Sequence, residues 1–198
     1  MTDAIDPAET AVLALVARGE HEAATAAVLR RWGGELYGFL FALARNPADA
    51  DDAWAVLGAK IWRSLPQFAG RSSLRTWLYV LARRSLARAT RRRRDDLIPL
   101  SQASELGRLA AEIRQTSLPH LGRVRDRLAD LRAELPAEDQ ELLILRVDRE
   151  LPWRDVAEVI ADDGDDLDKV AATARKRFER VKARIRELAL ARGLVEPE

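Results

Sequence analysis

Apolar residues recur along most of this chain at steps of three and four, the spacing that places them on one face of a helix. Alternating runs of β-branched residues, which would indicate strands, are almost absent. The pattern therefore predicts an all-α protein.

Four helices are expected in the first half of the chain. They span residues 7–18, with Asp6 as the N-cap, residues 20–45, residues 48–65, and an arginine-rich stretch that follows a loop at residues 66–73. Glycine is unfavourable inside a helix, so Gly33 and Gly34 are expected to break or bend the second helix.

Composition changes after residue 94, where proline, serine, glutamine and charged residues mix. We interpret residues 95–122 as a linker, with a possible short helix at 104–115, between two small helical domains at 1–94 and 123–198. In the second domain we expect helices over 123–135, from near Pro136 and Pro152, and over 167–192, the last one ended by Gly193.

Residues 71–94 carry nine arginines and no acidic residue, although the whole chain has a formal net charge of only +1. An apolar stripe runs between these arginines, formed by Leu74, Trp77, Leu78, Leu81, Ala82 and Ser85. A helix that buries one face and presents arginine on the other is suited to a polyanion. The alternative is a core helix with a solvated face, but such faces normally mix acids with bases. If the segment binds DNA, replacing Arg91 to Arg94 together should flatten the salt dependence of binding.

A second basic helix lies near the C-terminus. Residues 153–161 form an amphipathic pattern, a polar and acidic turn follows, and the helix after it is dense in lysine and arginine. Two helices joined by a turn, the second one basic, match a helix-turn-helix DNA reader. A solvated helix or a coiled-coil partner would give a similar pattern.

Catalytic and metal chemistry are not expected. The chain has no cysteine, and its two histidines, His21 and His120, lie far apart without paired ligands or nucleophiles nearby. The acidic run at 162–168 lacks the spacing of an EF-hand, and no glycine-rich phosphate loop is present. We expect no enzyme activity, no metal and no cofactor.

The N-terminus lacks the basic start and apolar core of a signal peptide, and no uncharged apolar run approaches the about 18 residues that a membrane span needs. The expectation is a soluble cytoplasmic protein without membrane insertion.

Taken together, the chain resembles an extracytoplasmic-function (ECF) sigma factor. The matching stretches are DADD at 49–52 followed by KIW at 60–62, FAGRSSLRTWLYVLAR at 68–83, LP at 135–136, LLILR at 142–146, LPWRDVAE at 151–158 and TARKRFER at 173–180. The resemblance implies two helical domains, regions 2 and 4, joined by a flexible linker. It also implies a non-enzymatic protein that binds core RNA polymerase and directs it to promoters.

The resemblance implies a role for three sets of residues. The polymerase, through its β′ clamp helices, would be bound by Asp49, Asp51, Asp52, Lys60 and Trp62, and region 4 would meet the β flap. The −10 element would be bound as a single strand by Arg71, Ser72, Arg75, Tyr79, Arg83, Arg84 and Arg88. The −35 element would be read by Thr173, Arg175, Lys176, Glu179 and Arg180. Trp77 lies on the apolar stripe, so packing is favoured over base contact for it.

The chain departs from the family pattern at several positions. Ala55 and Val56 stand where the family has Gln-Glu, Gly58 replaces a bulky apolar residue, and Arg84 replaces an Asn. The turn at 161–172 is longer than in the family and acidic, which fits a helix cap, a partner contact or a screen against DNA. Two alternatives stay open: a helix-turn-helix regulator that does not engage polymerase, and a sigma-like decoy for an anti-sigma protein. An anti-sigma partner is also expected of a true sigma factor.

Overall fold

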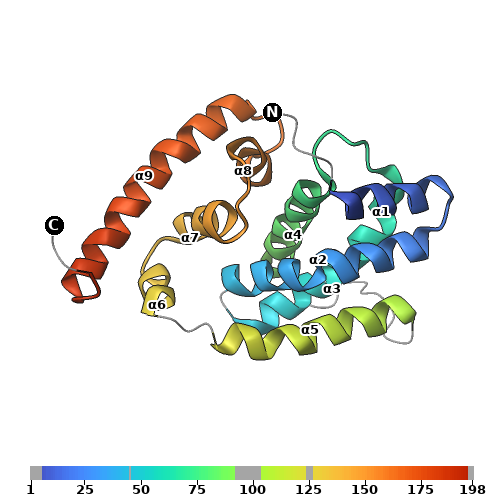
Figure 1. Ribbon diagram of the computed structural model, residues 1–198, viewed down its shortest axis with the longest axis horizontal. Coiled ribbons are helices and arrows are strands. Elements are labelled where there is room, and N and C mark those ends of the chain that lie inside the picture. The colour runs from blue at the N-terminus through green and yellow to red at the C-terminus, as the bar shows by residue number, and fades with distance from the viewer. Residues whose placement is uncertain (1–5, 45, 92–103, 124–126, 196–198) are drawn as a thin grey trace. The chain divides into compact units, whose positions relative to one another are not determined.

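The computed structural model describes residues 6–44, 46–91, 104–123 and 127–195, and within these ranges every regular element is helical (Figure 1). The all-α prediction is confirmed. The chain divides into two compact units, residues 1–120 and 121–198. Arg92 to Arg94, and the first part of the expected linker at 95–103, lie outside the described residues.

The first unit is a bundle of packed helices. It contains α1 (Pro7–Ala17), α2 (His21–Leu43), α3 (Pro47–Ser64), the short 3-10 helix η1 (Leu65–Gln67), α4 (Leu74–Arg91) and most of α5 (Glu105–Arg123). Figure 1 shows α2, α3 and α4 lying side by side, and they pack pairwise on one another. The centre of the bundle is large and aromatic, with Trp32, Tyr37, Phe39, Leu57 and Leu78 fully buried.

The starts of α1 and α3 follow from local sequence signals. Asp6 caps α1 by accepting a hydrogen bond of 2.8 Å from the backbone N–H of Ala8, and Asn46 caps α3 through the N–H of Asp49 at 2.9 Å. Each cap is followed by a proline in the first turn, where its missing N–H costs nothing. The predicted cap and start of the first helix are confirmed.

The predicted break at Gly33 and Gly34 is wrong, because α2 continues through both residues without interruption. Gly33 is buried, and a Cβ atom added to it would lie 2.7 Å from Cδ1 of Ile113 in α5. The glycine therefore permits the close approach of a second helix instead of ending its own.

The buried stripe of α4 is broader than expected. Leu74, Leu78, Ala82 and Ser85 are buried as predicted, whereas Trp77 and Leu81 are only half-buried. Two polar residues, Thr76 and Tyr79, are fully buried as well. Trp77 packs against Phe68 of the preceding loop, with ring centroids 5.2 Å apart, as the packing interpretation expects.

The second unit contains α6 (Arg127–Ala133), α7 (Ala137–Leu143), a π-helical segment η3 (Ile144–Asp148), α8 (Trp153–Ile160) and α9 (Leu167–Ala191). Its core cluster joins Leu135, Leu143 and Val181, with Phe178, Ile185 and Leu188 packed against it. The helix starts near Pro136 and Pro152 are confirmed, since these prolines are the N-caps of α7 and α8. Gly193 follows the end of α9 with φ +62°, the left-handed conformation predicted for a helix stop.

No helix in the described part of the chain combines the length and the apolar character needed to cross a bilayer.

Candidate nucleic-acid interface

The outer side of α4 and the loop before it form a basic surface. Arg71, Arg84 and Arg88 are exposed, and Arg83 and Ser72 are half-buried. The junction between loop and helix is fixed by Ser73, whose Oγ accepts a hydrogen bond of 3.0 Å from the backbone N–H of Thr76. This bond fixes the start of α4 relative to the loop that carries Arg71 and Ser72.

Two of the residues predicted to bind the −10 element are engaged inside the first unit. Nε of Arg75 donates a hydrogen bond of 2.9 Å to Oε1 of Glu35 in α2, Nη2 of Arg75 forms an ion pair with the same oxygen, and the Tyr79 hydroxyl also donates to it. Tyr79 has no exposed surface. The structure therefore places Tyr79 in the core, where its hydroxyl donates to a partly buried carboxylate, and not on the basic surface.

Glu35 is the residue that sequence reasoning missed in this cluster. Burial opposes the charge of Arg75, but the hydrogen bond and the charge of Glu35 outweigh it and raise the pKa of Arg75. The Arg75 guanidinium also lies 5.9 Å from the centre of the Tyr79 ring. Glu35 thus ties the first turns of α4 to α2.

Lys60 of α3 lies beside the basic surface. Its pKa is lowered, first by burial and then by the positive charges of Arg88 and Arg84. Like charges that gather in this way repel one another in the free protein, and a bound phosphate would relieve the repulsion. Lys60 was predicted from the sequence as a polymerase contact, and in the structure it adds a positive charge beside Arg84 and Arg88.

The acidic start of α3 is partly occupied by contacts within the unit. Oδ2 of Asp49 accepts a hydrogen bond of 2.7 Å from Asn46, and Asp52 is half-buried. Asp51 accepts hydrogen bonds from the Tyr37 hydroxyl at 2.9 Å and from Arg114 of α5 at 2.8 Å. Burial, followed by the hydrogen bond to Asp51, raises the pKa of Tyr37 above its usual range.

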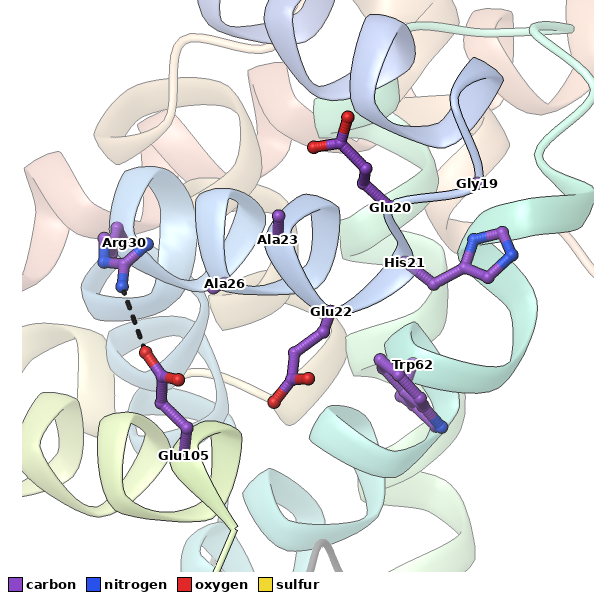
Figure 2. Close-up of a pocket in the computed structure, with 9 residues that line it drawn as sticks. All are labelled: Gly19, Glu20, His21, Glu22, Ala23, Ala26, Arg30, Trp62 and Glu105. Carbon is purple, nitrogen blue, oxygen red and sulfur yellow. Dashed lines mark ion pairs between the residues drawn. The ribbon is translucent and has the colours of Figure 1, made fainter.

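Trp62, the last of the predicted polymerase contacts, lies at the edge of an acidic hollow of about 600 Å³ (Figure 2). Trp62 is 38% exposed. The hollow is lined by residues 19–23, which end the turn after α1 and begin α2, and by Ala26, Arg30, Trp62 and Glu105. Three of its lining residues are glutamates. Its charge is unsuited to DNA, so this side of the unit differs from the basic surface of α4.

In the second unit, α8, the turn at 161–166 and α9 form the predicted pair of helices. All five residues predicted to read the −35 element are exposed on α9: Thr173, Arg175, Lys176, Glu179 and Arg180. Trp153 at the start of α8 packs edge-on against Phe178, with centroids 5.4 Å apart, and the Arg175 guanidinium lies 6.0 Å from the Trp153 ring. The aromatic pair holds the two helices together beneath the exposed residues.

Arg177, although it lies among these residues in sequence, belongs to the scaffold. It forms an ion pair of 2.6 Å with Glu138 and a second, shorter one with Asp139, both in α7. The hydrogen bond to Asp139 is the main reason why the pKa of Arg177 is raised. This contact anchors α9 to α7 and leaves the exposed side of α9 to the other cations.

The acidic turn contributes the cap of α9. Oδ1 of Asp166 accepts hydrogen bonds from the backbone N–H groups of Asp168 at 3.0 Å and Lys169 at 3.2 Å. Asp165 accepts a further bond of 3.0 Å from the N–H of Asp162, and Gly164 adopts φ +95° between them. Of the roles considered for residues 161–172, helix capping is the one that these contacts display.

Comparison with known families gives one match. Residues 28–95 match the family model described as Sigma-70 region 2, a range that includes α3, the loop after it and the basic surface of α4. No curated protein sequence matches the chain. Because the match falls on the elements that carry Lys60, Arg71, Arg84 and Arg88, it supports a sigma factor of the sigma-70 family, with a role in polymerase binding and promoter melting.

Proposed function

We propose that the protein is an ECF sigma factor that binds core RNA polymerase and directs promoter-specific initiation without catalysis of its own. The observation that carries this proposal is the position of the Sigma-70 region 2 match, which coincides with a helix whose outer side is basic and free of acidic residues. Under this proposal, residues 1–94 serve as region 2, residues 95–122 as the linker and residues 123–198 as region 4. An anti-sigma protein is a further proposed partner.

Region 2 would capture the −10 element as a single strand. Opening the duplex costs unstacking, and the cost is offset when exposed bases are stacked or enclosed and their phosphates are paired. Arginine suits both tasks because its planar guanidinium stacks on bases and pairs with phosphate. The proposed DNA contacts are Arg71, Ser72, Arg83, Arg84 and Arg88, with Lys60 beside them. Arg75 and Tyr79 would act by holding α4 in place through Glu35.

Region 4 would read the −35 element with α9 in the major groove. The exposed set from Thr173 to Arg180 supports this, since these side chains lie on one helix whose other side is fixed by Phe178, Val181 and Arg177. Asp49, Asp51, Asp52, Lys60 and Trp62 remain the proposed polymerase contacts. Of these, Asp51 is already held within the unit by Tyr37 and Arg114.

The experiment that tests the proposal is a pull-down of bacterial core RNA polymerase by the purified protein, followed by run-off transcription from the same complex. Stable binding with new promoter-dependent transcripts would support the sigma factor. Binding to DNA without polymerase would favour a helix-turn-helix regulator, and binding to neither would favour a decoy for an anti-sigma protein.

Replacing Lys60 with glutamine is expected to lower the salt dependence of promoter binding. The slope of log K against log salt should fall by about 0.7 to 0.9, because one fewer counterion is released when one phosphate contact is lost. The slope is measured by titrating promoter DNA at several salt concentrations. Arg31→Gln is the matched control, since it removes the same charge from an ion pair with Asp6 at 3.1 Å. Equal slopes for Lys60→Gln and the unmodified protein would show that Lys60 does not contact a DNA phosphate.

Replacing Arg175 or Arg180 with alanine is expected to weaken discrimination of the −35 element by about 1–3 kcal/mol each, the range for a lost base contact. The measurement compares affinity for the preferred −35 sequence with affinity for a permuted one. Equal losses on both sequences would make these residues phosphate contacts and not base readers.

A further inference from the structure

Helix α5 lies against the side of the first unit that α2 and α3 form (Figure 1). The indole Nε1 of Trp54 in α3 donates a hydrogen bond of 3.0 Å to the backbone carbonyl of Ala110 in α5. Gly33 of α2 leaves the room that Ile113 fills, since a Cβ atom there would lie 2.7 Å from Cδ1 of Ile113. The segment interpreted as a linker from the sequence therefore contains a helix docked on the first domain.

This docked helix covers part of α3 that the proposed function assigns to polymerase. Arg114 of α5 binds Asp51, one of the proposed polymerase contacts, at 2.8 Å. Residues 51, 55, 58 and 62 follow one another at helical steps of three and four, and residue 54 lies three positions after residue 51, so they share one side of α3. That side includes Ala55 and Gly58, the positions at which the chain departs from the family pattern. Two occupants, α5 and a polymerase helix, would thus compete for the same side of α3.

The attachment of α5 is weak for a packed helix. Among its described side chains, residues 105–117, Leu106 is the single large apolar residue that is buried, while Leu109 and Ile113 are half-buried. Its ion pairs are open to solvent: Arg114 and Asp51 are 38% and 35% exposed, and the pair of Arg30 with Glu105, drawn in Figure 2, measures 3.9 Å. Exposed ion pairs contribute little to stability, so α5 is held firmly enough to dock and loosely enough to leave.

We propose that α5 is a removable cover, and that core RNA polymerase binds the side of the first unit formed by α2 and α3 only after α5 has dissociated from that side. The inference rests on the proposed function, because it needs polymerase to be the competing partner. The free protein then exists in a covered and an open state, and the apparent affinity for polymerase is the intrinsic affinity reduced by the open fraction.

A disulfide offers a direct test, because the chain contains no cysteine of its own. A Cβ atom at Gly34 would lie 3.6 Å from Oγ of Ser117 in α5, which is close enough for the paired substitutions Gly34→Cys and Ser117→Cys to form a disulfide across the contact. The oxidised double variant should bind core polymerase at least about tenfold more weakly than the same protein after reduction, because the open state is removed. The two single variants, treated with the same oxidant and reductant, control for effects of either cysteine alone.

Ile113→Asp tests the opposite direction. A carboxylate placed against buried Gly33 should release α5, increase hydrogen exchange at its amides and strengthen binding to core polymerase. Gln115→Asp is the control, because it adds the same charge at an exposed position of α5. Equal polymerase binding by the oxidised and reduced forms, or no gain with Ile113→Asp, would overturn the cover while leaving the sigma factor intact. Failure of every form to bind polymerase, Ile113→Asp included, would overturn the proposed function and the cover with it.

Discussion

Replacing Glu35 with alanine is expected to destabilise the first unit by about 2–3 kcal/mol. The carboxylate accepts hydrogen bonds from Arg75 and Tyr79, and its side chain is only 18% exposed. Its removal takes away the acceptor that a partly buried guanidinium and a fully buried hydroxyl share, and the lost hydrogen bonds count against the folded state. The variant tests whether the link between α2 and α4 is needed to present the basic surface.

Hydrogen exchange resolved by peptide is the suitable measurement, since it reports on each unit separately. Peptides of α2 and α4 should lose protection in Glu35→Ala, while those of α8 and α9 should not change. Glu35→Gln should lower the free energy of unfolding by about half as much as Glu35→Ala, because the amide oxygen still accepts one of the hydrogen bonds. Glu112→Ala, at an exposed position of α5, is the control. Unchanged protection of α4 in Glu35→Ala would show that core packing alone positions the helix.

Replacing Leu143 with alanine is expected to destabilise the second unit by about 3 kcal/mol, within the range for a buried leucine that leaves a cavity. Leu143 is 4% exposed and belongs to the cluster that joins α7 to Val181 of α9. A unit of this size has a free energy of unfolding of only about 5 kcal/mol, so the loss is a large share of it. Under the proposed function, binding to the −35 element should weaken as well, since α9 loses part of its support.

The same exchange experiment checks this prediction, with α7 and α9 expected to lose protection together. Val147→Ala is the control in the same unit, because Val147 is 47% exposed and its truncation should change stability by less than about 0.5 kcal/mol. A comparable loss in both variants would mean that the second unit has no defined core at Leu143.

Local signals allowed much of the fold to be predicted from the sequence. Asp6, Pro152 and Gly193 each mark a helix end through chemistry that acts within a few residues, by capping an N–H group, fixing φ or adopting a positive φ. Such effects need no knowledge of the rest of the chain. The predicted ends of α1, α8 and α9 accordingly agree with the structure to within a residue or two.

The features that escaped prediction depend on residues distant in sequence. Gly33 resembles a helix breaker until Ile113, 80 positions later, is placed against it. Tyr79 resembles a base-stacking aromatic until Glu35 is found to accept its hydroxyl bond. Helix periodicity locates the apolar stripe but not the polar groups that are buried beside it, because their burial requires a partner on another helix. The exposed set on α9 was predictable because these residues fall outside the apolar stripe of their own helix.

The acidic turn before α9 gives that helix an uneven charge along its length. Five aspartates between positions 162 and 168 lie at its N-terminal end, and the cations from Arg175 onward follow. Near a duplex, such an arrangement exerts a torque as well as an attraction: the middle of the helix is drawn towards the phosphates while its first turn is pushed away. The second unit would then be turned towards one approach angle before any base is touched, so that a larger share of its collisions with DNA begin in a productive orientation.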